Sequence, residues 1–273
     1  MFSQNRVFPG ITHITDNMGV SCTLIEGKER ALLFDAGYGM EDLSEYLAGI
    51  NQKPVEVFLS HGHHDHVLGA RWFRKVYLCK EDMDEFLLRT GAEQRRRVMQ
   101  QAEAQGLKVP DGYLEAEIPK PEIIRFTDRA GSFERRREDL GHMAVQVIRV
   151  PGHTAGSIVL FIPEYDLLLT GDDWNPCTWM WFPCSEKATV WRDRMKELVR
   201  TIEKENRREI KHILCSHQPM RREADEMKAF LEYATDERLK EAPHVDMGSE
   251  INTHEVRREP EGWQLIFDYD KVF

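Results

Sequence analysis

The feature that most constrains this chain is a six-residue run, His61-Gly62-His63-His64-Asp65-His66, which directly follows an apolar segment. Residues 55–60 have the pattern of a buried strand, and functional loops commonly follow the carboxyl ends of such strands in α/β folds. A tight loop at that point can direct several imidazoles and one carboxylate at one ion. Imidazole with carboxylate suits Zn²⁺, and also iron or manganese. The run therefore predicts a metal site, whereas a surface histidine tract would not require the apolar strand before it.

Three later positions repeat this arrangement of a metal-binding side chain at the end of an apolar run. They are His153, Asp172 and His217, and a glycine precedes each of the first two. Glycine permits unusual backbone angles and a close approach to a ligand. These three residues are therefore further candidates for the metal site.

Together these segments resemble the signature of the metallo-β-lactamase superfamily, which reads His-x-His-x-Asp-His, then Gly-His, Gly-Asp and a late His. All four elements occur in this order, and the resemblance spans residues 31–217. It implies a fold of the α/β (α+β) class, a four-layered αββα sandwich of two mixed sheets with helices outside. The site is then expected at one edge of the paired sheets.

Carried over position by position, the resemblance implies two groups of metal ligands. His61, His63 and His153 would hold the first ion, Asp65, His66 and His217 would hold the second, and Asp172 would bridge both. The implied cofactor is a pair of divalent ions, zinc first, with iron or manganese as alternatives. Their charge exceeds that of the two carboxylates and a bridging hydroxide, so the site would stabilise an anionic transition state. Because a metal-bound water has a pKa of about 7, we expect hydroxide to attack, with Asp65 and Asp172 as the catalytic carboxylates.

Other polar residues have a less direct expected role. Asp35 matches the family's early aspartate and is expected to orient the ligand loop, since ligating histidines usually donate their other N–H to a carboxylate or carbonyl. An ordinary turn aspartate is the alternative. His64 is left outside the ligand set because its neighbours would point to the opposite side of the loop. His13 and His244 lie beside expected loops and are the other histidines best placed to reach the site.

The segment after Asp172 is unusually aromatic for a loop bounded by prolines. Trp174, Trp179, Trp181 and Phe182 are expected to wall a substrate pocket for an apolar acyl group or a ring. Filling of the hydrophobic core is the alternative of equal weight. Arginine triplets at 95–97 and 135–137 fit solvated faces better than a site for an anionic substrate.

Hydrophobic periodicity predicts alternating strands and helices. The expected strands are 31–34, 55–60, 76–79, 144–150, 157–162, 167–170 and 210–215, and the expected helices are 40–50, 67–73, 81–105, 188–205 and 223–233. Residues 251–256 and 263–267 are expected to form a closing hairpin. A length of 273 residues suits one domain over 1–273, with an insertion at about 81–131 and a C-terminal extension at about 237–273.

Composition narrows the partners of the chain. Lys and Arg total 37 against 47 Asp and Glu, a net charge of −10, which disfavours nucleic acid and acidic membranes as partners. The five scattered cysteines suggest reduced thiols, and neither a signal segment nor a long apolar run is recognisable. We therefore expect a cytoplasmic protein that acts on a small molecule, and its sequence allows a homodimer.

The leading functional hypothesis is a dinuclear metallo-hydrolase acting on an ester, thioester, lactone, amide or phosphodiester of a small molecule. Cleavage of β-lactams is disfavoured because zinc β-lactamases proper generally lack an aspartate at the position of Asp172. A persulfide dioxygenase of the same superfamily is the redox alternative, with a single iron at the first site. A non-catalytic, metal-stabilised binding module is a third hypothesis. Metal stoichiometry separates the first two, and an exchangeable metal-bound water would separate an enzyme from the third.

Overall fold

The first sheet starts with three strands that periodicity did not predict. In this computed structural model, which describes residues 1–272, the strands β1 (Ser3–Phe8), β2 (Ile11–Thr15) and β3 (Ser21–Glu26) form an antiparallel meander. Their short, mixed polar and apolar sequences conceal the alternation that marks a half-buried strand. The meander continues antiparallel into β4 (Ala31–Phe34), the first strand that the sequence predicted.

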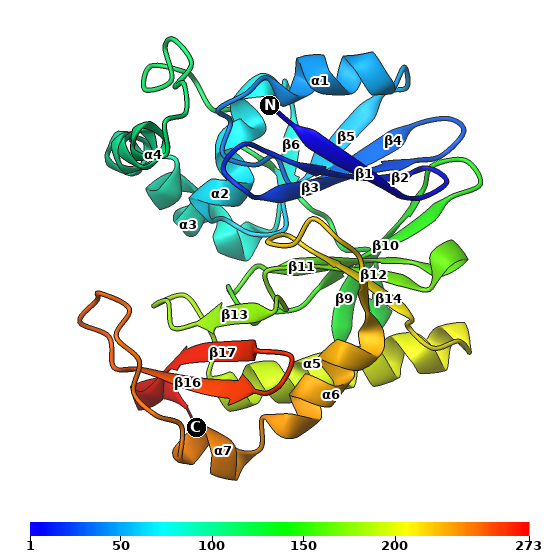
Figure 1. Cartoon of the computed structure of the whole chain (residues 1–273). Coiled ribbons are helices and arrows are strands. Elements are labelled where there is room, and N and C mark those ends of the chain that lie inside the picture. The colour runs from blue at the N-terminus through cyan, green and yellow to red at the C-terminus, as the bar shows by residue number, and fades with distance from the viewer. Residues whose placement is uncertain (273) are drawn as a thin grey trace. The chain divides into compact units, whose positions relative to one another are not determined.

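From β4 onward the same sheet is parallel. The remaining strands are β5 (Val55–Phe58), β6 (Val76–Leu78) and β7 (Glu122–Ile123), and the sheet has seven strands in the order β1 to β7. The helix α1 (Leu43–Ile50) connects β4 to β5 and runs alongside this sheet (Figure 1). It begins where the Asp42 carboxylate accepts a hydrogen bond from the backbone N–H of Glu45 (3.0 Å), and it buries Leu43 and Leu47. This sheet is thus mixed, as the resemblance implied.

Helices after β5 differ from the prediction in their limits. A helix was expected over 67–73, but α2 (His64–Val67) begins inside the histidine run and is followed by a 3₁₀ turn at Leu68–Trp72. Asp65 occupies the first turn of α2, where a negative charge is favourable. The expected helix 81–105 is two helices, α3 (Met83–Arg89) and α4 (Ala92–Ala104). They separate at Gly91, whose extended backbone starts α4.

The second sheet contains the meander predicted from residues 144–170. Strands β10 (Ala144–Arg149), β11 (Ile158–Ile162) and β12 (Leu167–Gly171) pair antiparallel, and β14 (His212–Cys215) joins β12 in parallel. The sheet also contains β8 (Asp128–Ala130), β9 (Phe133–Asp139) and β15 (Arg222–Glu223), in the order β15-β14-β12-β11-β10-β9-β8. It is therefore a second mixed sheet of seven strands.

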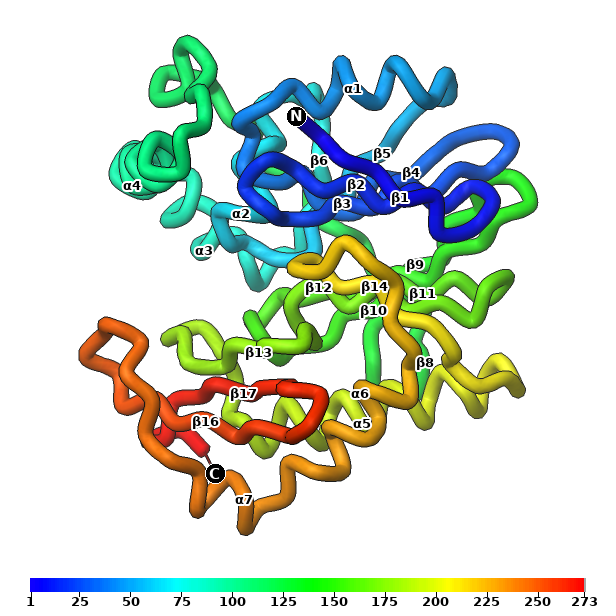
Figure 2. The backbone as a smooth tube through the Cα atoms, viewed as in Figure 1, coloured from blue at the N-terminus to red at the C-terminus, as the bar shows by residue number. Residues whose placement is uncertain are grey.

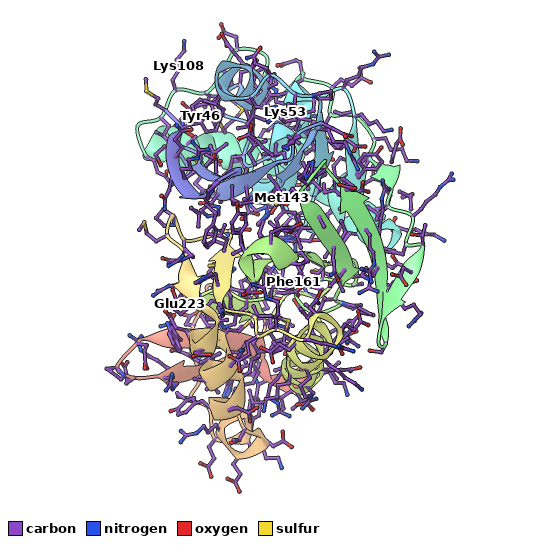
Figure 3. All side chains as sticks on the ribbon, turned by 90° about the vertical axis from the view of Figure 1, so that its right-hand side faces the viewer. Tyr46, Lys53, Lys108, Met143, Phe161 and Glu223 are labelled. Carbon is purple, nitrogen blue, oxygen red and sulfur yellow. The ribbon has the colours of Figure 1, made fainter. Side chains whose placement is uncertain are left out.

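Three helices accompany this second sheet: α5 (Ala188–Asn206), α6 (Ala224–Tyr233) and α7 (Asp236–Lys240). On α5, Trp191, Met195, Leu198 and Ile202 are buried at helical spacing. They pack in one core with Phe161 of β11, which Figure 3 labels. Each fully buried side chain of this kind contributes about 1.5–3 kcal/mol.

The C-terminal hairpin expected at 251–267 is present as β16 (Thr253–Arg258) and β17 (Trp263–Asp268). The structure adds a strand that the sequence did not predict, β13 (Cys177–Met180), within the aromatic segment. β13 pairs in parallel with β17 although the two lie far apart in the chain, as the tube in Figure 2 shows. The C-terminal extension therefore supports the aromatic segment.

The arginine triplet at 135–137 was expected to be solvated, and for Arg135 this is wrong. Its side chain is 3% exposed and donates hydrogen bonds to Asp128 Oδ2 (2.8 Å), Glu205 Oε2 (2.5 Å) and Gln146 Oε1 (3.1 Å). These partners come from β8, α5 and β10. Arg135 therefore ties α5 to the sheet, a structural role that local charge patterning does not reveal.

The chain groups into two compact units, and each is described by itself. Unit 1 contains Met1–Arg125, Arg137–Val145 and Ser216–Met220, and unit 2 contains Phe126–Arg136, Gln146–Cys215 and the residues from Arg221 onward. A single domain over 1–273 stays a prediction. Among the helices of residues 1–272, none combines the length and the apolar character that a membrane crossing needs.

Candidate metal centre

Unit 1 brings three of the predicted ligands together around one carboxylate oxygen. Asp65 Oδ2 lies 3.5 Å from His66 Nε2 and 3.5 Å from His217 Nε2. Tetrahedral zinc with bonds of 2.0–2.2 Å separates its ligand atoms by about 3.3–3.6 Å. The two measured separations match atoms that share a cation. This donor set therefore fits a divalent metal.

Electrostatics keep Asp65 in the form that a metal requires. Burial by itself raises the pKa of Asp65, but the neighbouring His66, His64 and His217 outweigh it and hold the pKa well below the ordinary value. The carboxylate is thus ionised at neutral pH. An ionised carboxylate among imidazoles is the donor combination that zinc, iron and manganese accept.

Asp35, which was expected to orient the ligand loop, hydrogen-bonds His66 of this group. It is fully buried, and its carboxylate accepts hydrogen bonds from His66 Nδ1 (2.9 Å), the Ser60 backbone N–H (2.6 Å) and Ser216 Oγ (3.4 Å). Because Asp35 engages Nδ1, the other ring nitrogen of His66, Nε2, faces Asp65. Asp35 has a positive φ of 68°, which is compatible with the turn hypothesis too, but its side chain orients a candidate ligand.

The loop of His217 is held by its neighbours on both sides. The Ser21 backbone N–H donates to the Ser216 carbonyl (2.8 Å), and His13 Nε2 lies 2.9 Å from the Gln218 carbonyl oxygen. His13 was singled out as a histidine that could reach the site. It instead hydrogen-bonds Thr23 Oγ1 and the carbonyl next to His217, so it supports the loop.

His61 and His63 lie in the same unit at the end of β5. Their rings meet edge to face with centroids 4.6 Å apart. His61 Nδ1 hydrogen-bonds Ser60 Oγ (2.9 Å), and His63 Nε2 lies 3.4 Å from Glu85 Oε1. One nitrogen of each ring is thus engaged by a neighbouring oxygen, which fixes the orientation of the other nitrogen.

Unit 2 contains the other two predicted ligands. His153 Nδ1 hydrogen-bonds the Trp179 carbonyl (2.7 Å), and the backbone N–H of His153 donates to Asp173 Oδ1 (2.8 Å). His153 Nε2 lies 3.8 Å from Asp172 Oδ2, and the other carboxylate oxygen of Asp172 accepts from Asn175 Nδ2 (3.1 Å). Each side chain is therefore oriented by a hydrogen bond on one atom, Nδ1 of His153 and Oδ1 of Asp172, while Nε2 and Oδ2 face each other.

The aromatic residues after Asp172 separate into two groups. Trp174 is fully buried and contacts Trp263 edge to face in the core, so core filling describes it and not a pocket wall. Trp179 is 39% exposed, and Trp181 stacks on Phe182 with ring centroids 4.5 Å apart. Phe182 also meets the His153 ring edge to face at 5.5 Å. Phe182 therefore borders a candidate metal ligand, and Trp179 and Trp181 pack against Phe182.

The remaining singled-out histidines lie outside the predicted ligand groups. His64 begins α2 and packs against Tyr38, with ring centroids 5.6 Å apart, and burial lowers its pKa. His244 is exposed and pairs with His254 in an isolated β-bridge. His64 stays outside the expected ligand set as a prediction, and His244 is held at the C-terminal hairpin of unit 2.

Sequence reasoning missed the residues that hold the ligands from outside the motif. Glu85 lies beside His63, Asp82 accepts from the Gly62 backbone N–H (2.7 Å), and Asp173 and Asn175 hold His153 and Asp172. Asp173 and Asn175 lie one and three residues after a predicted ligand, so proximity to Asp172 was an available signal. For Asp82 and Glu85, in a helix of an apparent insertion, the sequence carried none.

The family model described as the metallo-beta-lactamase superfamily matches residues 15–200. This chain belongs to the metallo-β-lactamase superfamily. Acyl-coenzyme A thioesterase MBLAC2 of Gallus gallus is 25% identical over 191 residues, which are 64% of this chain and 66% of the relative. An uncharacterized protein of Mycobacterium leprae is 27% identical over 160 residues, 58% of this chain and 65% of the relative. The chain thus spans slightly less than two thirds of the length of these curated relatives.

Solved structures agree on the fold. A metallo-beta-lactamase from Pontibacter korlensis superposes with a TM-score of 0.56 at 17% identity and covers 85% of this chain and 98% of the other. The sec-alkylsulfatase Pisa1 from Pseudomonas sp. gives a TM-score of 0.62 at 17% identity over 84% of this chain and 40% of the other. With two mixed sheets and their helices, these likenesses confirm the predicted metallo-β-lactamase fold class.

Proposed function

We propose that this chain is a metal-dependent hydrolase that cleaves an ester, thioester, lactone, amide or phosphodiester bond of a small molecule, with a thioester as the first candidate. Membership of the superfamily supports the reaction class. The name of the relative from Gallus gallus, an acyl-coenzyme A thioesterase, supports the choice of thioester. The observation that carries the proposal is the placement of His66 Nε2 and His217 Nε2 at 3.5 Å from one oxygen of Asp65.

Two divalent cations are the proposed cofactor, zinc first and iron or manganese as alternatives. His61, His63 and His153 would hold the first, Asp65, His66 and His217 the second, and Asp172 both. When bound, such cations lower the pKa of a coordinated water to about 7 and polarise the substrate oxygen. The donor atoms within each unit support this assignment by chemistry and spacing.

The contribution of the protein is to hold these donors before any substrate arrives. Asp35 fixes the ring of His66, and the Trp179 carbonyl fixes the ring of His153. Asn175 holds one oxygen of Asp172. A ligand that is already hydrogen-bonded through its other polar atom loses little conformational freedom when a metal binds. Mutating such a hydrogen-bond partner commonly weakens metal affinity by about 10–100-fold.

Trp179, Trp181 and Phe182 are proposed to contact the apolar part of the substrate. Their support is the exposure of Trp179 and the ring contact of Phe182 with His153. Large aromatic surfaces favour an acyl chain or a flat ring. The net charge of −10 supports a small molecule over nucleic acid as the partner. We also propose a cytoplasmic location and a homodimer.

The test is metal analysis of the purified chain followed by assays with thioester, lactone, phosphodiester and cephalosporin probes. We expect two divalent ions per chain. We also expect hydrolysis of the thioester probe, and Asp172→Ala should abolish it. His64→Ala is the matched control, because His64 is in the same run but outside the predicted ligand set, and it should retain activity. A single iron with oxygen uptake on a persulfide would replace the proposal with the dioxygenase hypothesis. Metal without any turnover would favour a binding module.

A further inference from the structure

The helix α3, from the segment expected as an insertion, packs directly on the ligand loop. Asp82, the residue before α3, accepts a hydrogen bond from the Gly62 backbone N–H (2.7 Å). A Cβ atom at position 62 would lie 2.8 Å from the Phe86 backbone nitrogen and 3.0 Å from the Glu85 Cβ. Only glycine lets α3 approach this closely. The glycine inside the histidine run is thus explained by the helix that covers it.

That close approach places one carboxylate of α3 against a candidate ligand. Glu85 Oε1 lies 3.4 Å from His63 Nε2, and the side chains are 15% and 6% exposed. The same oxygen accepts a hydrogen bond from Arg89 Nε (2.6 Å), one helical turn further along α3. Glu85 is therefore an acceptor that Arg89 holds in place beside Nε2 of His63.

We propose that Glu85 is a positioning residue that holds His63 as a metal ligand, with Arg89 holding Glu85 in place. The proposal rests on the proposed function, because it assigns His63 to a metal. A neutral imidazole of His63 with its Nε2–H directed at Glu85 has its lone pair on Nδ1, and Nδ1 is then the nitrogen that would bind a cation. Carboxylates commonly orient ligating histidines in this way.

The assignment gives the segment 81–131, expected as an insertion, a role beside the ligand loop. The start of this segment supplies two acidic contacts to the ligand loop, from Asp82 to the backbone and from Glu85 to a ring. Neither contact requires the segment to move. We therefore expect changes in α3 to alter metal binding without any change of substrate.

The test compares Glu85→Ala and Glu85→Gln with the wild-type chain and with Asp84→Ala, a matched control. Asp84 is an exposed acidic residue next to Glu85 on the same helix. Affinity for Zn²⁺ is measured by competition with a chelator, and the ligand-field spectrum is recorded with Co²⁺. Glu85→Ala should weaken one of the two Zn²⁺ sites by about 10–100-fold and alter the Co²⁺ spectrum. Glu85→Gln, whose amide oxygen still accepts from Nε2–H, should restore most of the affinity, and Asp84→Ala should match wild type.

A second measurement needs neither a variant at position 85 nor bound metal. Long-range ¹H–¹⁵N NMR of the metal-free chain reports the tautomer of each imidazole, and a His63→Gln sample assigns the His63 signals. The proton of His63 is expected on Nε2. A neutral His63 ring with its proton on Nδ1 and none on Nε2 would overturn the proposal even where Glu85→Ala fails to fold.

Two further results would overturn it. If Glu85→Ala binds both ions like wild type with an unchanged Co²⁺ spectrum, Glu85 has no positioning role. If Glu85→Gln loses as much affinity as Glu85→Ala, Glu85 is itself a ligand. A wild-type chain that binds no divalent ion would defeat the proposed function, whereas the NMR measurement would still decide the contact between Glu85 and His63.

Discussion

At the scale of single residues, Asp35 shows how one buried carboxylate can organise a site. It accepts hydrogen bonds from a ring, a backbone N–H and a hydroxyl that come from three separate segments of unit 1. A carboxylate offers about four acceptor positions and no donor, which suits three converging donors. Its place after β4 is visible in the sequence, but the partners that it gathers are not.

Replacing Asp35 with alanine should therefore destabilise the metal-free chain by roughly 2–4 kcal/mol, because buried donors lose their acceptor. Asp35→Asn should cost less, since asparagine tolerates the positive φ and keeps one oxygen acceptor. Urea unfolding followed by circular dichroism measures both. A loss below about 0.5 kcal/mol for Asp35→Ala would reduce Asp35 to an ordinary turn residue.

Cys215 provides a second residue-scale prediction, on thiol reactivity. Burial, and then the negative charge of Asp172, raise the pKa of the Cys215 thiol to about 12. Because only the thiolate is alkylated and the raised pKa leaves roughly one thiolate in ten thousand at pH 8, we expect no labelling of the folded chain by iodoacetamide. Cys177, which is exposed, is the internal control and should be labelled first. Peptide mass spectrometry before and after unfolding in urea distinguishes the two, and rapid native labelling of Cys215 would contradict the burial.

At the scale of elements, the turn after the histidine run is locked to the strand end that carries Asp35. The Gly69 backbone N–H donates to the Gly37 carbonyl (2.9 Å), and the Ala36 N–H donates to the His66 carbonyl (3.0 Å). A Cβ at Gly69 would lie 1.9 Å from the Ala36 carbonyl oxygen. The close approach of these two backbones therefore depends on glycine.

Gly69→Ala should cost about 3 kcal/mol or more, because the atoms in the way belong to backbone and cannot rotate aside. Gly49→Ala is the matched control, since no atom lies within 4 Å of its added Cβ and Gly49 is exposed near the end of α1. The control should raise stability by about 0.5–1 kcal/mol. Chemical unfolding of both variants gives the comparison, and equal stability of the two would show that the backbones can separate freely.

A second relation between elements joins the C-terminal hairpin to His153. β17 pairs with β13, and the Trp179 carbonyl of β13 accepts from the ring of His153. The extension thus stabilises the strand that orients a candidate ligand. In unit 1, helix α3 likewise contacts His63. In both units, therefore, a segment outside the motif orients a histidine of the motif.

At the scale of the whole molecule, bound metal should contribute to stability. A ligand present at 100 times its dissociation constant stabilises the folded state by about 2.7 kcal/mol. For a chain of this size, removal of that ligand lowers the melting temperature by roughly 5–10 °C. Calorimetry with and without a chelator measures the shift, and readdition of Zn²⁺ should reverse it. An identical melting temperature in both conditions would argue against a metal bound in the folded state.

The sequence by itself determined the motif residues and much of the strand order after residue 31. Those strands are apolar runs closed by glycine or polar residues, and their ligands directly follow them, so local pattern is sufficient. The first three strands, the split of α3 from α4, and β13 escaped prediction. Strands of mixed polarity form because a neighbouring strand completes their hydrogen bonds, and that partner is not visible in the local sequence.

Only the tertiary structure decided which side chains hold the ligands and which aromatic residue fills the core. Glu85 reaches His63 because α3 packs on Gly62, and Trp174 is buried because residues of the C-terminal hairpin cover it. The local sequence shows the spacing of apolar residues and so predicts helices and strands. It does not show which distant segment a polar or aromatic side chain will contact. For that reason the chemistry of the ligands could be predicted from the sequence, and the contacts that orient them could not.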